Sequence, residues 1–183
     1  MDLSWNHFYN KTLAFVLMLV IGASCTKPMP VTPEQEAKLE KKVQSLLVQA
    51  TKFLRGDSKD SELAAFSKLK IAYELSPDDP RVLDALGCLY WKKGDLNTAY
   101  SYFKQATQIN NYYDRGYAHM ALIAEERKEY REAENLYQLA IQMNPLNFRT
   151  RNNYALMLRR INSDPNLDFK ASSEYLKAIA SRD

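Results

Sequence analysis

The residue types that carry most enzyme chemistry are few in this 183-residue chain, and none has the spacing that a reaction requires. His119 has no Cys, His or Asp beside it at the spacing of a metal-ligand set, and the cysteines, Cys25 and Cys88, fit no metal motif. No glycine-rich phosphate loop or nucleophile elbow occurs. We therefore expect no catalysis, no metal and no cofactor. We interpret His119 as an ordinary helical histidine, Cys88 as a small buried hydrophobe, and Glu125 to Glu129 as a solvated helix end.

Composition favours helices and argues against nucleic-acid binding. Only five Gly and seven Pro occur, and 46% of the residues are hydrophobic, which is enough for one all-α domain of ordinary size. The 25 basic and 22 acidic residues are interleaved and leave a net charge of +3. Proteins that track phosphates carry a basic block instead, so no nucleic-acid partner is expected.

A period of 34 residues organises the middle of the chain. Small residues at 87, 99, 121 and 133 would let paired helices approach closely, and the rings of Phe103 and Tyr137 would fill the space beside each crossing. The first repeat has Leu83, Leu86, Gly87, Tyr90, Gly94, Ala99, Phe103 and Ala106, and the second has Tyr117, Met120, Ala121, Ala124, Lys128, Ala133, Tyr137 and Ala140. The pattern resembles that of tetratricopeptide repeats.

This resemblance implies an all-α fold, a right-handed α-solenoid of about four helix hairpins. We predict hairpins at residues 35–77, 80–111, 114–145 and 147–181, which together form a repeat domain over 35–183. The outer two are less regular, with extra turn residues near 56–58 and 162–165. A generic helical bundle is the alternative, but it would not repeat its packing residues at a fixed offset.

Tetratricopeptide arrays bind proteins or extended peptides on the concave face lined by the first helix of each hairpin, and the resemblance implies the same here. The groove-facing positions are those that the packing pattern does not use. They are Arg81, Asp84, Cys88, Trp91 and Lys92; Arg115, Ala118, Leu122 and Glu125; and Arg149, Asn152, Asn153, Leu156 and Arg159.

Three groups of these residues have chemistry suited to a partner. Arg81, Arg115 and Arg149 lie 34 residues apart, so stacked hairpins would set three guanidinium groups in a row able to hold carboxylates or backbone carbonyls. The amides of Asn152 and Asn153 both donate and accept, as a bound main chain requires, and the indole of Trp91 could anchor a partner. The alternatives are solvated arginines, locally bonded amides and a tryptophan that covers the next repeat.

The N-terminus has the pattern of a bacterial export signal. Lys11 precedes an apolar run over 12–21 that is too short to span a bilayer, and small residues then lead to Cys25. We predict a signal peptide over 1–24 of the type that resembles a lipobox, with lipid such as palmitate on Cys25. Gly22 stands where lipoproteins usually have Leu, so cleavage by ordinary signal peptidase is the alternative. Thr26 after the cysteine resembles the outer-membrane class, which predicts an anchor there facing the periplasm.

A proline-rich tether over 25–34 is expected to precede the repeats. Thr32, Pro33 and Gln35 have the pattern of a capping box at a helix start. At the other end, Tyr175, Leu176 and Ile179 would leave an apolar helix face with no capping helix after it. That face could serve self-association or a second docking site.

A further resemblance concerns the role in the cell. The run Asn152-Asn153-Tyr154-Ala155 resembles the Asn-Asn-Tyr-Gly stretch of type IV pilus biogenesis lipoproteins of the PilF/PilW kind, with Ala155 in place of the glycine. It implies a scaffold that helps an outer-membrane secretin assemble. Adaptors of cell-wall hydrolases (NlpI type) and the tight-adherence pilus lipoprotein TadD are alternatives. A carrier of lipid or glycan fragments would need a deep apolar groove, which the arginines do not favour.

Overall fold

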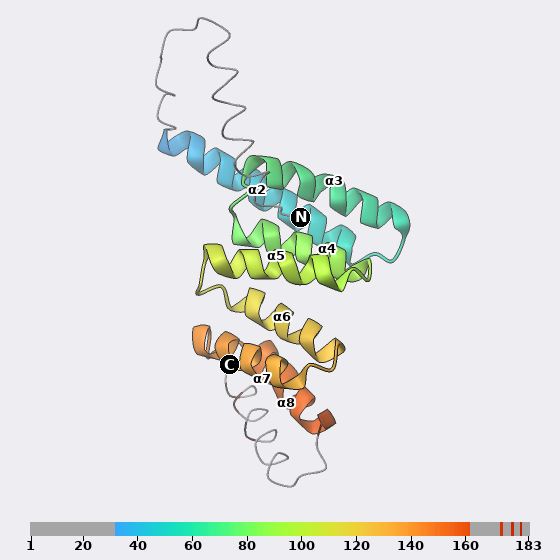
Figure 1. The fold of residues 1–183 in the computed structure, drawn as a ribbon. Helices are drawn as coiled ribbons and strands as arrows, with labels where there is room; N and C mark the ends of the chain where they lie inside the picture. The colour runs from blue at the N-terminus through green and yellow to red at the C-terminus, as the bar shows by residue number, and fades with distance from the viewer. Residues whose placement is uncertain (1–31, 162–172, 174–176, 178–179, 181–183) are drawn as a thin grey trace, which may run out of the picture. The chain divides into compact units, whose positions relative to one another are not determined.

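The computed structural model describes residues 32–161 together with 173, 177 and 180. Seven helices lie in this part of the chain (Figure 1). They are α2 (Pro33–Leu54), α3 (Lys59–Leu75), α4 (Pro80–Lys92), α5 (Leu96–Ile109), α6 (Asp114–Glu126), α7 (Tyr130–Met143) and α8 (Phe148–Ile161). The chain divides into two compact units, Met1–Lys38 and Leu39–Asp183.

The described end of the first unit contains the helix start that the sequence predicts. The backbone N–H of Gln35 donates to Thr32 Oγ1 at 3.3 Å, and the N–H of Thr32 donates to Gln35 Oε1 at 2.9 Å. This reciprocal pair is a capping box, with Pro33 at the first helical position. The predicted cap of α2 is therefore confirmed.

In the second unit, consecutive helices from α3 to α8 pack against one another, most extensively within the hairpins α4–α5 and α6–α7. Figure 1 shows α4 to α8 stacked in the order of the sequence. The fold is all-α and of the tetratricopeptide solenoid kind, as predicted. Tyr175, Leu176 and Ile179, which were expected on the second helix of the fourth hairpin, lie outside the described residues, and so does the leader with Cys25.

The residues that the 34-residue period placed at the helix crossings are buried. Ala99, Phe103 and Ala106 are fully buried on α5, and Ala133, Tyr137 and Ala140 occupy the equivalent places on α7. Gly87 lies so close to the Phe103 ring that a Cβ added to this glycine would stand 2.4 Å from Cε1 of that ring. The small residues thus allow the close helix crossing for which the sequence pattern selected them.

The turns inside the two regular hairpins also repeat. Gly94, two residues after the end of α4, has a φ of +80°, and Lys128, two residues after the end of α6, has a φ of 64°. Both therefore adopt the left-handed conformation. The N–H of Asp95 donates to the carbonyl of Tyr90, and the N–H of Glu129 donates to that of Ala124. These are the bonds of a Schellman motif, which favours glycine at the left-handed position.

Candidate partner-binding groove

A cavity of about 820 Å³ opens beside α2 and α4 in the second unit, and we call it the basic cavity. It has exposed cations at Lys52 and Arg55 and an exposed apolar side chain at Val48, which keeps 60% of its surface accessible. Its lining residues are Gln44, Leu47, Val48, Thr51, Lys52, Leu54, Arg55, Arg81, Asp84, Ala85, Cys88 and Arg115. Four residues predicted for the groove therefore share this cavity: Arg81, Asp84, Cys88 and Arg115.

Arg81 is held by carboxylates of its own chain. Its Nη2 lies 2.6 Å from Asp79 Oδ2, and its Nη1 lies 2.8 Å from Glu40 Oε1. Asp79 also caps α4, because its side chain accepts the backbone N–H of Arg81 at 2.8 Å. The hydrogen bonds that Arg81 donates to Asp79 and then to Glu40 raise the pKa of Arg81 above its ordinary value. A partner's carboxylate would have to compete with these two bonds.

Asp84 lies at the floor of the basic cavity, with 1% of its surface exposed. Arg115 Nη2 contacts its Oδ2 at 2.8 Å, and His119 Nδ1 contacts its Oδ1 at 2.7 Å. Burial is the largest single effect on Arg115 and lowers its pKa, but the negative charge of Asp84 and smaller contributions from other neighbours together raise that pKa above its ordinary value. Asp84 is thus a buried anchor for two side chains of α6. The sequence had predicted that Asp84 faces the partner.

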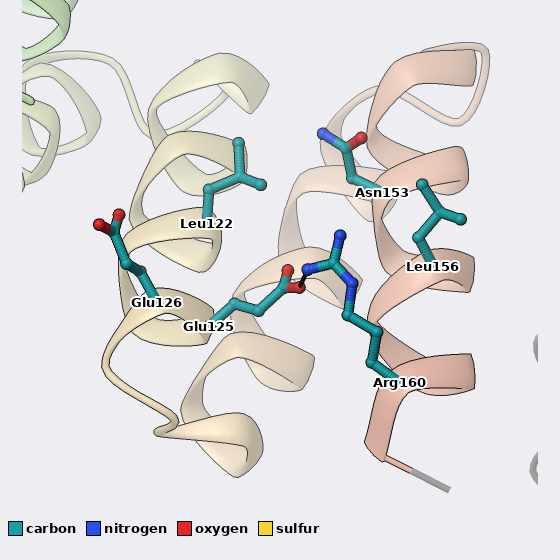
Figure 2. A pocket seen from close by; sticks show the side chains of 6 residues that line it. All are labelled: Leu122, Glu125, Glu126, Asn153, Leu156 and Arg160. Atoms are coloured by element: carbon teal, nitrogen blue, oxygen red, sulfur yellow. Dashed lines mark hydrogen bonds and ion pairs between the residues drawn. The ribbon is translucent and has the colours of Figure 1, made fainter. Parts of the chain in front are cut away.

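A second cavity, of about 220 Å³, lies between α6 and α8. Figure 2 shows Glu125 on α6 reaching toward Arg160 on α8, whereas Glu126 points away from α8; Leu122, Asn153 and Leu156 complete the lining. We call it the α6/α8 cavity. Four residues predicted for the groove share this cavity: Leu122, Glu125, Asn153 and Leu156.

Glu125 differs from the solvated residue that we expected. Its side chain is only 10% exposed, accepts a hydrogen bond from the Tyr137 hydroxyl at 3.1 Å, and forms an ion pair with Arg160 (Figure 2). The sequence interpretation was wrong here, because a contact with α8 could not be read from the charged run itself. The carboxylate instead ties the third hairpin to the fourth.

Trp91 and Lys92 make contacts within the fold. The indole Nε1 of Trp91 donates to Glu126 Oε2 at 3.0 Å, and its ring packs edge-on to Phe103 at a centroid distance of 6.4 Å. Lys92 Nζ donates to the carbonyls of Leu54, at 2.9 Å, and Gly56. Lys92 therefore ties the end of α4 to the turn after α2.

The remaining predicted groove residues are Ala118, which is buried on α6, and three residues of α8. Arg149 and Arg159 are exposed, Asn152 is half-buried, and the Arg149 guanidinium lies 5.9 Å from the ring centroid of Phe148. They line neither of the two cavities. The three arginines of the predicted row thus have different surroundings, although a role in partner binding stays a prediction for each.

One cluster was not found from the sequence. Asp84, Cys88 and His119 each offer a ligand atom, and these atoms lie within 4.8 Å of one another. The expectation that His119 has no such neighbours was correct along the chain but wrong in space. A signal existed: residue 118 is one repeat after Asp84, so residue 119 lies beside it on the next first helix.

Among the described residues, no helix has the length and apolar character needed to cross a membrane.

Comparison with known proteins agrees with this geometry. The family model described as tetratricopeptide repeat matches residues 80–113 and 114–145. The uncharacterized protein ycf37 of Pyropia yezoensis is 37% identical over 67 residues, and this match spans 37% of each protein.

Solved structures share the fold at low identity. MamA is 18% identical, with a TM-score of 0.59 and coverage of 81% of this chain and 83% of MamA. The first tetratricopeptide domain of Spaghetti (RPAP3) is 16% identical, with a TM-score of 0.56 and coverage of 66% and 94%. The O-GlcNAc transferase of Thermobaculum terrenum has a TM-score of 0.66 at 15% identity, but the likeness covers 76% of this chain and only 26% of that enzyme. Residues 80–145 of this chain are therefore two tetratricopeptide repeats within an all-α solenoid fold of the same kind.

Proposed function

We propose that this chain is a protein-interaction scaffold whose basic cavity binds an extended, acidic segment of a partner protein. The observation that carries the proposal is the pairing of free positive charge with exposed apolar surface in one cavity. Lys52 and Arg55 are exposed there, and neither has an ion pair within the part of the chain that the structure describes. Val48 lies beside them in the lining.

The cations of the cavity differ in how available they are. Arg81 and Arg115 already contact carboxylates of the chain, so Lys52 and Arg55 supply the charge that a partner would meet first. Exposed cations attract and orient an acidic segment, while burial of apolar surface supplies most of the affinity. A segment with carboxylates and a small apolar side chain would satisfy both features.

A structural neighbour supports this chemistry. The tetratricopeptide domain of Spaghetti was solved with the HSP90 peptide SRMEEVD, whose last four residues are two glutamates, a valine and an aspartate. Those four residues combine acidic groups with one apolar side chain, as the basic cavity would require. It is therefore a suitable probe for this chain.

Fluorescence anisotropy with labelled SRMEEVD tests the proposal. We expect Lys52→Glu with Arg55→Glu to weaken binding at least about tenfold, since a change of about 1.4 kcal/mol corresponds to that factor. Lys70→Glu with Lys104→Glu is the matched control, because both lysines are exposed on second helices and line neither cavity. Equal affinity for all three proteins, or no binding at any peptide concentration, would refute the acidic-segment proposal.

We further propose that the chain is exported, carries lipid on Cys25 and faces the periplasm from the outer membrane. The lipobox-like residues before Cys25 and the Thr after it support this location. The Asn152-Asn153-Tyr154-Ala155 run supports a scaffold role in type IV pilus and secretin assembly, with cell-wall hydrolase adaptors and tight-adherence pili as alternatives. Cell fractionation of Cys25→Ser tests the anchor: a variant that still sediments with membranes would exclude it.

A further inference from the structure

We propose that Asp84, Cys88 and His119 form a site for one zinc ion at the floor of the basic cavity. The three side chains supply oxygen, sulfur and nitrogen, the donor types that Zn²⁺ accepts in proteins. Asp84 and Cys88 lie one helical turn apart on α4, and His119 reaches them from α6. The site would join two consecutive repeats.

The distances between the three ligand atoms are close to those that a bound zinc ion would require. The three ligand atoms lie within 4.8 Å of one another, and Asp84 Oδ1 is 2.7 Å from His119 Nδ1. Zinc bonds of about 2.0–2.3 Å in a tetrahedron place ligand atoms roughly 3.3–3.8 Å apart. Side-chain torsions would therefore need to move the atoms by about 1 Å, without a change in the helices.

A neighbouring side chain holds one of the proposed zinc ligands, as is common in metal sites. Arg115 holds Asp84 Oδ2 at 2.8 Å, which orients the carboxylate, and the ion would take the place of the contact between Asp84 Oδ1 and His119 Nδ1. Such outer contacts to ligating carboxylates fix the ligand geometry. Asp84 and Cys88 also line the basic cavity, which gives the ion a path from solvent.

Tyr113 lies near the cluster. Its buried hydroxyl has no hydrogen bond of ordinary geometry among the described residues, although Asp84 is close enough to interact with it. Buried hydroxyls nearly always have a partner. A water molecule in the fourth coordination position of zinc would provide one, and three protein ligands with one water is a common zinc arrangement.

The thiol would have to lose its proton when the metal binds. Burial, followed by the charge of Asp84, raises the pKa of Cys88 to about 12. The proton leaves to solvent as the thiolate bonds to the ion, so one proton is released from Cys88 for each zinc bound. No oxidant or reductant is involved.

Cobalt substitution tests the site in the purified full-length chain, kept in detergent and freed of metal with a chelator. Titration with Co²⁺ should give a thiolate-to-cobalt charge-transfer band that saturates at one equivalent and disappears when Zn²⁺ is added. Cys88→Ser should abolish the band, and His119→Gln should weaken binding at least about 100-fold, since even residues that only orient a ligand change affinity by about 10–100-fold. Cys25→Ser, the matched control, should keep the band unchanged.

Several results would overturn the proposal. They are cobalt binding without the thiolate band, a band that depends on Cys25, or affinity that is unchanged in His119→Gln. Far-ultraviolet circular dichroism checks that each variant is folded. If Cys88→Ser does not fold, the decision rests on His119→Gln and the Cys25→Ser control. The peptide test above uses Lys52 and Arg55, which are not ligands, so failure of one proposal is distinguishable from failure of the other.

Discussion

Replacement of Gly87 by alanine tests the close helix crossing on which the repeat fold depends. Alanine is favoured over glycine inside a helix by about 1 kcal/mol, so intrinsic propensity alone predicts a more stable protein. The structure predicts the opposite. The new Cβ would lie 2.4 Å from Cε1 and 2.7 Å from Cδ1 of Phe103, well inside the contact distance of about 3.5–4.0 Å.

The magnitude follows from the burial of that ring. Phe103 is fully buried, so its ring has no open space into which it can move. Overpacking of a core typically costs about 1–3 kcal/mol, which exceeds the helix-propensity gain. We expect Gly87→Ala to lower the free energy of unfolding by about 1 kcal/mol.

Urea unfolding of a double-mutant cycle measures the effect. Phe103→Leu removes the ring atoms nearest the new Cβ, so in that background Gly87→Ala should become neutral or stabilising, with a coupling energy of about 1–2 kcal/mol. Ala121→Gly is the matched control at the equivalent position of the next repeat, and it should destabilise the protein by about 1 kcal/mol. A Gly87→Ala protein that is more stable than the parent, with no coupling to Phe103, would refute the reasoning.

Three further predictions concern the turns, the buried thiol and the buried carboxylate. Lys128→Gly should raise the free energy of unfolding by about 1 kcal/mol, and Gly94→Ala should lower it by about 1 kcal/mol, because both residues have the left-handed backbone conformation that favours glycine. Thermal unfolding measures each change. Alkylation of Cys88 by iodoacetamide, followed by mass spectrometry, should stay slow in the folded protein well above about pH 8.5, because the pKa of Cys88 is raised to about 12. An unfolded thiol reacts readily at that pH, so equal rates in the folded and unfolded chains would contradict this prediction. Asp84→Ala should cost about 1.5–3 kcal/mol in urea unfolding, since it removes the charged hydrogen-bond partner of Arg115 and His119. A cost below about 0.5 kcal/mol would show that the carboxylate is not a structural anchor.

The sequence predicted the packing of the repeats well because that packing depends on residue size at a fixed offset. Gly87, Ala99 and Phe103 could be placed from the 34-residue period alone, and each has the predicted role. The capping box at Thr32 was equally predictable, because its partners are three residues apart.

The polar contacts of the groove were less predictable because their partners lie in other helices. Arg81 is held by Glu40, from the irregular first hairpin, whose register the 34-residue period does not define. Lys92 caps carbonyls at the end of α2, which carry no side-chain signal. His119 meets Asp84 one residue away from the repeat offset, so a comparison of equivalent positions alone would miss it.

The central claim, that a partner segment lies in the basic cavity, is tested most directly by photo-crosslinking in living cells. A photoreactive amino acid at Val48, which is exposed inside the cavity, should capture a partner, and Lys52→Glu with Arg55→Glu should abolish the adduct. The same probe at Ile71, exposed on α3 and outside the cavity, should capture none. Capture of the partner from Ile71 and not from Val48, unaffected by the charge reversals, would contradict the account.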